Sequence, residues 1–210
     1  MTITTVVYHS VEAHTRVIGE CIVDGLKAMP DNDVAMISVD AVDASWDRLH
    51  RPDLLIFGTP THIGGVSAEM QAFIEKTSGP VWRDRMWTGK LAAGFTCSAG
   101  RGGDKFHVLD RLVVFAAQMG MTWVPLHLLG GHFSSAGSEN DLNRLAGYLG
   151  LMSQANIDEP SEQTPPEADR ETARLFGRYL GEVAARWRVG CEELGPVPVP
   201  GHGVRRPPLP

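Results

Sequence analysis

Short apolar runs that alternate with amphipathic stretches of helical length constrain the fold of this 210-residue chain most strongly. The runs are residues 3–8, 34–39, 54–58, 91–96 and 122–126, and helices are predicted over 14–28, 68–77, 105–119 and 167–189. Parallel strands that are covered on both faces form continuous apolar runs, and their connections usually contain a helix. The pattern therefore predicts an α/β protein with a central parallel sheet.

The stretch between residues 127 and 166 is less regular. Residues 127–140 are rich in Gly, Ser and His, and we expect a loop at the edge where open α/β sheets bind ligands. Leu142, Leu145 and Leu149 recur at spacings of three and four, which predicts a helix over 141–151. A polar, proline-bearing connection over 156–166 should then lead into the last helix.

The organisation predicted is one domain over residues 1–190, followed by a Pro-rich tail over 191–210. Residues 195–210 contain six prolines, which disfavour both helix and sheet. We hypothesise that this tail lies across a neighbouring subunit, and lattice packing alone is the alternative.

Charge and composition narrow the class of protein. A net charge of -6 argues against a nucleic-acid binder, which usually presents a basic face. No apolar run approaches the roughly 18 residues of a membrane span, and the N-terminus lacks a signal-peptide pattern, so we expect no membrane partner and a cytoplasmic location. The three cysteines form no CxxC pair and the histidines no HExxH motif, so no metal site is predicted.

Polar loops follow three of the predicted strands, and in a doubly wound sheet such loops meet at one edge. In the first, HSVEAHTR (residues 9–16), Ser10 and Thr15 place hydroxyl groups beside the N–H groups that open a helix. This arrangement suits a phosphate, although a plain helix cap is the alternative. The loop has neither a GxxxxGK[ST] nor a GxGxxG motif, which disfavours a nucleoside triphosphatase and a Rossmann site.

The other two loops suit a flat ligand. In LLIFGTPTHIGG (residues 54–65) a rigid, polar turn precedes Gly64 and Gly65, which allow close approach of the backbone. The alternative is an ordinary turn into a helix capped by Ser67. In TCSAGRGGD (residues 96–104) the glycines leave N–H groups free to face the carbonyl oxygens of a heterocycle, and Arg101 could add a cation.

Four segments carry a resemblance to a known family: YHSVEAHT, IFGTPTHIGGVSAEMQAFIEKTSG, GKLAAGFTCSAGRGGD and MGMTWVPL. In this order the chain resembles flavodoxin-like flavoproteins, above all the WrbA-type NAD(P)H:quinone oxidoreductases and the related NADPH-dependent FMN reductases. The resemblance covers about residues 3–190. It implies a flavodoxin-like three-layer sandwich with a five-stranded parallel sheet of order 2-1-3-4-5, and FMN at its carboxyl edge.

The resemblance also implies roles for individual residues. The residues implied to bind FMN are Ser10, His14 and Thr15 at the phosphate, Pro60, Thr61, His62, Ile63, Gly64 and Gly65 along the ring, and Ser98, Gly102 and Gly103 at its pyrimidine end. The residues expected in the substrate pocket are Arg101, His132 and Trp82, of which Trp82 matches a tryptophan that lines an adjoining subunit's site. His62 is the candidate catalytic residue, in contact with nicotinamide or acceptor.

The implied activity is hydride transfer from NAD(P)H through bound FMN to a quinone, nitroaromatic or free flavin in a ping-pong cycle, by a homodimer or homotetramer. The chain departs from the family at Glu12 and Ala13, where an aromatic residue and glycine are usual. His62 replaces the usual arginine or aromatic residue, and Gln118 and Met119 stand where WrbA-type members have histidines. Two alternatives stay open: a flavodoxin-type electron carrier, which usually has a dense acidic rim, and a non-catalytic interaction protein on the same fold.

Overall fold

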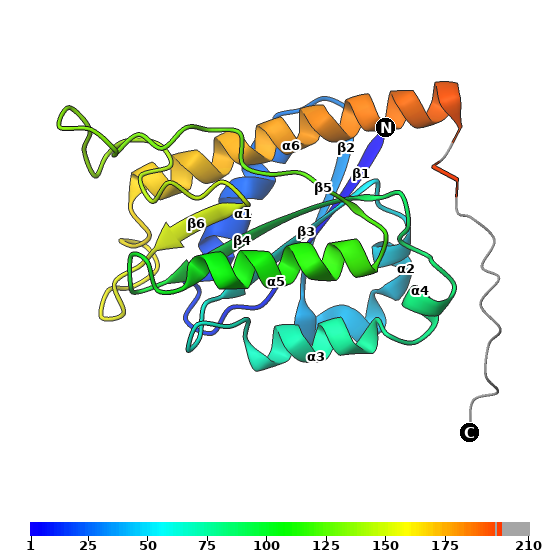
Figure 1. The fold of residues 1–210 in the computed structure, drawn as a ribbon, viewed down its shortest axis with the longest axis horizontal. Helices are drawn as coiled ribbons and strands as arrows, with labels where there is room; N and C mark the ends of the chain where they lie inside the picture. Colours follow the sequence, from blue (N-terminus) through cyan, green and yellow to red (C-terminus); the bar gives the residue numbers. More distant parts are fainter. Residues whose placement is uncertain (196, 199–210) are drawn as a thin grey trace.

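The computed structural model describes residues 1–195 and 197–198, in which a parallel sheet lies between two layers of helices (Figure 1). The strands are β1 (Thr2–Tyr8), β2 (Asn32–Ser38), β3 (Leu54–Pro60), β4 (Leu91–Ser98), β5 (Thr122–Trp123) and β6 (Leu151–Gln154). They lie in the order β2-β1-β3-β4-β5, and β6 pairs with β4. The flavodoxin-like order predicted from the sequence is confirmed, with β6 as an additional strand.

Helices cover both faces of the sheet. The long helices α1 (His14–Lys27) and α6 (Glu167–Leu194) lie on one face, and α3 (Ala68–Lys76) and α5 (Lys105–Gln118) lie on the other (Figure 1). The short helices α2 (Trp46–His50) and α4 (Pro80–Arg83) and the 3-10 segment η1 (Val39–Ala44) complete the described elements. Among the helices in this part of the chain, none is both long and apolar enough to span a bilayer.

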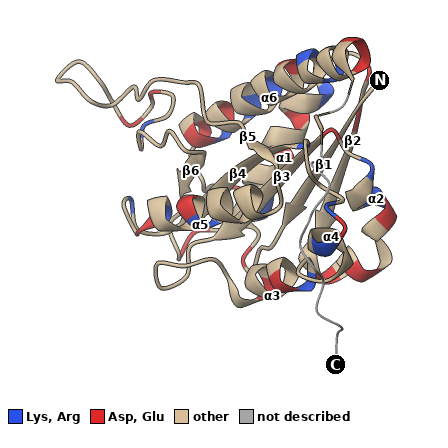
Figure 2. Cartoon of the chain, turned by 45° about the vertical axis from the view of Figure 1, so that its right-hand side comes forward, with Lys and Arg blue, Asp and Glu red and all other residues tan. Residues whose placement is uncertain are grey.

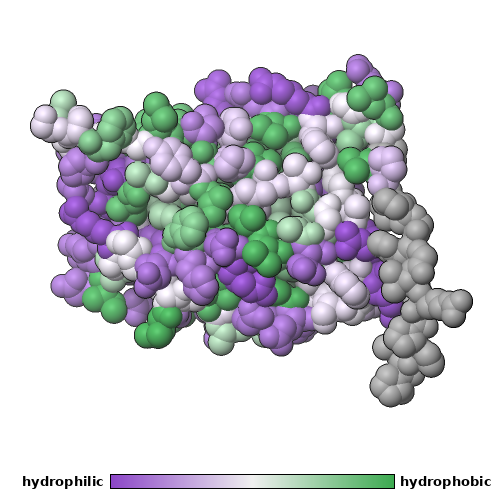
Figure 3. Space-filling view, in the orientation of Figure 1, coloured by the Kyte–Doolittle hydropathy of each residue, from purple (hydrophilic) through white to green (hydrophobic). Residues whose placement is uncertain are grey.

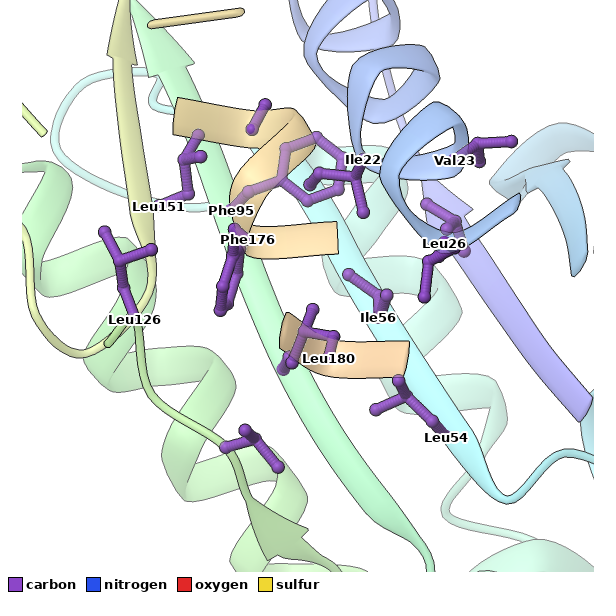
Figure 4. Close-up of a cluster of buried hydrophobic side chains, with 14 of the residues drawn as sticks. Ile22, Val23, Leu26, Leu54, Ile56, Phe95, Leu126, Leu151, Phe176 and Leu180 are labelled. Carbon is purple, nitrogen blue, oxygen red and sulfur yellow. The ribbon is translucent and has the colours of Figure 1, made fainter. Parts of the chain in front are cut away.

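Each face of the sheet has its own apolar core. Figure 4 shows Ile22 of α1 and Phe176 of α6 in the cluster that also contains Ile56 and Phe95 of the sheet. Phe57, next to Ile56, points to the opposite face, because successive side chains of a strand alternate. There the ring centroid of Phe57 lies 5.2 Å from that of Phe115. This two-sided burial explains why residues 54–58 of β3 form an unbroken apolar run.

Two glycines let α1 and α6 approach at the level of the backbone. A Cβ atom at Gly25 would lie 2.0 Å from the carbonyl oxygen of Arg174, and one at Gly177 would lie 2.1 Å from that of Ile22. Such distances are far below van der Waals contact, so neither position accepts a side chain without moving a helix.

Charged side chains lie mainly on the helices and loops, particularly along α6, and the central strands are largely uncharged (Figure 2). The face shown in Figure 3 mixes apolar and hydrophilic side chains. Phe106 and Val114 of α5 are exposed apolar residues at the surface of the molecule.

The helix predicted over residues 141–151 is wrong. Asn143 and Ala146 have φ values of 46° and 51°, in the left-handed region that interrupts a helix. The Asn143 side chain stabilises this path, since its Oδ1 accepts from the N–H of Gly147 and its Nδ2 donates to the carbonyl of Leu128. The spacing of the leucines is typical of a helix, and the sequence pattern carries no information on the hydrogen bonds of Asn143 that prevent one here.

The strand predicted over residues 122–126 is also shorter than expected, because β5 ends at Trp123. The chain leaves the sheet there, and β6 returns to pair with the carboxyl half of β4. At the other end, α6 continues past residue 190 to Leu194. The hypothesis that the Pro-rich tail contacts a neighbouring subunit concerns mainly residues 196 and 199–210, which lie outside the described part.

Candidate functional site

A cavity of about 400 Å³ opens at the carboxyl ends of β1, β3 and β4. Its volume falls within the range of about 300–1,000 Å³ that is usual for small-molecule sites. The lining residues are Ser10, Val11, Glu12, His14, Thr15, Pro60, Thr61, His62, Cys97, Ser98, Ala99, Ala155 and Ile157. The structure therefore brings residues from all three predicted loops together and adds a fourth loop, after β6.

The first loop leads into the N-terminus of α1. Ala13 has a φ of 65° and makes no side-chain cap, and the first turn of the helix contains no acidic residue. The Oγ of Ser10 accepts a hydrogen bond from the N–H of Arg16 at 3.2 Å, so Ser10 does act as a cap. The first N–H groups of a helix have no partner within it and carry partial positive charge. This end of the cavity can hold an anion.

The fourth loop, residues 155–166, was predicted as a connection to the last helix but not as part of the site. Nε2 of His14 lies 3.0 Å from the carbonyl oxygen of Glu159, and the N–H of Ala155 donates to the carbonyl of Ser98. Ala155 and Ile157 thereby form a wall of the cavity. The four residues of β6 are too few to show a recognisable strand pattern, so the sequence carries no clear signal for this wall.

Buried threonines hold the second loop. The hydroxyl of Thr96 donates to the carbonyl of Thr59 at 2.7 Å, and the Oγ1 atoms of Thr96 and Thr61 are 2.8 Å apart. Since Thr96 has a single hydroxyl proton, Thr61 must be the donor of that pair. Toward the cavity, Thr61 therefore offers a lone pair rather than a proton.

Residues 62–65 form a tight turn in which the N–H groups of His62 and Gly65 each donate to the other's carbonyl at 2.9 Å. Ile63 and Gly64 both have positive φ, 47° and 74°, as a type I′ turn requires. A β-branched residue is strained in this conformation. The Ile63 side chain is fully exposed at the tip, and Nδ1 of His107 from α5 lies 2.7 Å from the carbonyl oxygen of Gly64.

The ring-binding residues predicted from the sequence are thus divided. Pro60, Thr61 and His62 line the main cavity, whereas Ile63, Gly64 and Gly65 line an adjacent hollow of about 330 Å³ together with Asp104 and His107. Ser67 caps α3, because its Oγ accepts from the N–H of Met70 at 3.2 Å. The alternative interpretation of this segment, a capped turn into a helix, therefore coexists with its place at the cavity.

The third loop, residues 99–104, is exposed and rests on the buried Lys105. Nζ of Lys105 donates to the carbonyl oxygens of Gly100 and Arg101. Burial lowers the pKa of Lys105 to about 8 and raises the pKa of Cys97 to about 11. Ser98 lines the cavity, and Gly102 and Gly103 lie on the exposed loop beyond it.

The three predicted substrate-pocket residues lie outside the cavity lining. Glu139 brings Arg101 and His132 together, with Oε1 2.5 Å from Nη1 of Arg101 and 3.2 Å from Nδ1 of His132. Its Oε2 pairs with the buried Arg144. Trp82 lies on α4 with 48% of its surface exposed. Lys105 and His107, which hold the second and third loops, were not predicted, although both follow the glycine-rich loop directly in the sequence.

Comparisons with known proteins agree with this architecture. The family model for NADPH-dependent FMN reductase matches residues 6–135. A protein named flavodoxin FldP from Pseudomonas aeruginosa is 31% identical over 182 residues, which cover 85% of this chain and 94% of that protein. A protein named NAD(P)H dehydrogenase (quinone) from Geobacter sulfurreducens is 25% identical, covering 86% of this chain and 97% of its own length.

A solved structure of a related protein has a similar fold. The WrbA-like flavodoxin from Agrobacterium tumefaciens matches with a TM-score of 0.67 and 30% sequence identity, covering 89% of this chain and 99% of that one. The sheet order and the carboxyl-edge cavity are those expected of a flavodoxin-like fold. The chain belongs to the NADPH-dependent FMN reductase family.

Proposed function

We propose that the edge cavity binds FMN and that the protein transfers reducing equivalents from NAD(P)H to a quinone, or to a similar acceptor such as a nitroaromatic compound or free flavin. The observation that supports this most directly is the cavity itself, where the N-terminus of α1 meets the polar loops that follow β3 and β4 in a member of this family. FMN combines a phosphate with a flat heterocycle, so the two ends of the cavity fit its two ends.

The phosphate end would be formed by Ser10, His14 and Thr15 at the start of α1. The helix dipole and the free N–H groups there favour a dianion. Glu12 also lines the cavity, but it is exposed, so its carboxylate stays hydrated and its repulsion is screened by solvent. The residues present therefore fit a phosphate group in spite of the departure at Glu12.

The ring end would be formed by Pro60, Thr61 and Ser98, with Ile63 at the rim. FMN, when bound there, supplies hydride transfer between nicotinamide and a two-electron acceptor. The chain's contribution is to orient the ring and the substrates. His62, exposed at the mouth of the cavity, is placed to contact nicotinamide or acceptor, and we assign it that role.

We further propose that the protein works in the cytoplasm as a homodimer or homotetramer. The half-exposed Trp82 on α4 would then face the site of an adjoining subunit. Arg101 and His132, joined through Glu139 beside the third loop, would form the outer part of the substrate pocket.

An electron carrier is the second candidate, because the relative from Pseudomonas aeruginosa bears the name flavodoxin. The absorption spectrum of the purified protein, loaded with FMN and freed of excess, separates the two. Bleaching by NADPH and recovery on adding a benzoquinone are the expected results for the oxidoreductase. Bound FMN that NADPH does not bleach indicates the carrier, and failure to retain FMN contradicts both.

A further inference from the structure

Lys105 is the one fully buried lysine in the described part of the chain, and the proposed function does not account for it. It occupies the first position of α5, where both the helix dipole and the loss of hydration disfavour a cation. No ion pair joins it to a carboxylate among the described residues, and Asp169 is engaged by Arg144. Its partners are instead the carbonyl oxygens of Gly100 and Arg101.

These two hydrogen bonds determine the direction of the next N–H groups. In a planar trans peptide the carbonyl oxygen and the following N–H point to opposite sides. The N–H groups of Arg101 and Gly102 are therefore directed away from Lys105 and the interior. Neither donates a hydrogen bond to any residue that the structure describes, and both residues are exposed. Two adjacent donors thus face outward on the loop that follows Ser98 and Ala99, and those two residues line the cavity.

We propose that Lys105 is a positioning residue that holds the carbonyl groups of Gly100 and Arg101 inward, so that the N–H groups of Arg101 and Gly102 face an electron-rich oxygen of the bound ring. The proposal rests on the proposed function of the cavity and adds a residue to it. Adjacent N–H groups with a common direction form a concave site for negative charge. The buried ammonium adds its own charge beneath that site.

The charge of Lys105 should make ligand binding depend on pH. Burial lowers its pKa to about 8. The ionisable groups around it are Cys97 of β4, Asp169 of α6, and Arg144 of the segment that precedes β6. The Cys97 thiol has a pKa of about 11, so it stays neutral where Lys105 titrates. Loss of the ammonium converts charge-assisted hydrogen bonds into weaker neutral ones. The affinity for a ligand whose ring presents an electron-rich oxygen to this loop should therefore fall as the pH rises through about 8.

Binding of FMN to the full-length protein, followed by quenching of its fluorescence at pH 7.0 and pH 9.5, tests the proposal. Lys105→Met removes the charge at similar volume, and we expect about tenfold weaker binding at pH 7.0, which corresponds to about 1.4 kcal/mol. The variant should also lose the pH dependence that the unmodified protein shows above pH 8. An unchanged dissociation constant and an unchanged pH profile would overturn the proposal.

Lys90→Met is the matched control. Nζ of Lys90 also donates to a backbone carbonyl, that of Pro52 at 2.7 Å, and burial also lowers its pKa. Lys90 directly precedes β4, at the edge of the sheet opposite the cavity. We expect its replacement to leave FMN binding and its pH profile unchanged, so an equal loss in both variants would contradict a specific role for Lys105.

A second measurement needs no ligand. Trypsin cuts after Arg101, and mass spectrometry of the fragment 1–101 reports how firmly the third loop is held. In the absence of FMN we expect Lys105→Met to raise this cleavage rate about tenfold, with no change in Lys90→Met. Equal rates would overturn the positioning role.

The two measurements separate the two proposals. If the unmodified protein binds no FMN, the proposed function fails and the cleavage rate still decides whether Lys105 holds the loop. Circular dichroism checks that the variants fold, and Lys105→Gln, which keeps an uncharged NH2 donor group, takes the place of Lys105→Met if the latter does not fold. We expect Lys105→Gln to show intermediate cleavage and binding.

Discussion

Replacing Asp169 by Asn should destabilise the protein strongly, because Asp169 and Arg144 form a buried ion pair. Each side chain is only 3% exposed. Nε and Nη2 of Arg144 donate to the two carboxylate oxygens of Asp169 at 2.7 and 3.0 Å, and the N–H of Gln154 donates to Oδ2 at 2.8 Å. The pair thereby joins the start of α6 to β6 and to the segment that precedes β6.

The expected loss in the free energy of unfolding follows from the charge of Arg144, which remains buried in the variant. Removal of one partner of a buried ion pair costs about 3–5 kcal/mol, because the other charge is left without compensation. Oε2 of Glu139 still accepts from Nη1 of Arg144 at 2.7 Å, so we expect the lower end, about 3 kcal/mol. For a chain of this size, about 3 kcal/mol lowers the melting temperature by roughly 6–12 °C.

Urea denaturation followed by circular dichroism at pH 7 measures this loss. Glu171→Gln is the matched control on the same helix, because the pair that Glu171 forms with Arg174 is substantially exposed and is worth about 0–1 kcal/mol. The double variant Arg144→Met with Asp169→Leu should recover most of the stability. A loss below about 1 kcal/mol for Asp169→Asn would refute the assignment of Asp169 as the partner that compensates Arg144.

Three further predictions concern single positions. Ile63→Asn should raise the free energy of unfolding by about 1 kcal/mol, because Asn tolerates the left-handed conformation better than Ile. It should also weaken FMN binding, because the apolar side chain at the tip of the turn is lost. Thermal melting and fluorescence titration measure the two effects, and a fall in stability would contradict the idea that Ile63 is strained. Gly25→Ala should lower the free energy of unfolding by about 2 kcal/mol or more in urea denaturation, since its Cβ would overlap the carbonyl of Arg174. An increase in this free energy, as expected from helix propensity alone, would show that α1 and α6 can move apart without penalty. His62→Ala should lower acceptor turnover more than FMN affinity, and the opposite pattern in steady-state kinetics and titration would reassign His62 to cofactor binding.

Several elements were predictable because their causes are local. The apolar runs of β1, β3 and β4, the start of α1 at His14 and the cap at Ser67 depend on residues within a few positions of each other. The three polar loops followed from the rule that the carboxyl ends of parallel strands meet at one edge. The resemblance to a flavoprotein family then identified the kind of ligand.

The sequence by itself therefore determined the positions of β1 to β4 and of the helices α1, α3, α5 and α6, the edge that carries the site, and the family. Only the tertiary structure decided the path of residues 124–154, the fourth wall of the cavity and the burial of Lys105. The physical reason is that these features depend on contacts between distant residues. Asn143 turns the chain by bonding to Leu128, Arg144 is buried because Asp169 compensates it, and His14 contacts the carbonyl of Glu159 in the fourth loop. No local periodicity records such pairs, since each partner alone is compatible with a helix, a loop or an exposed surface.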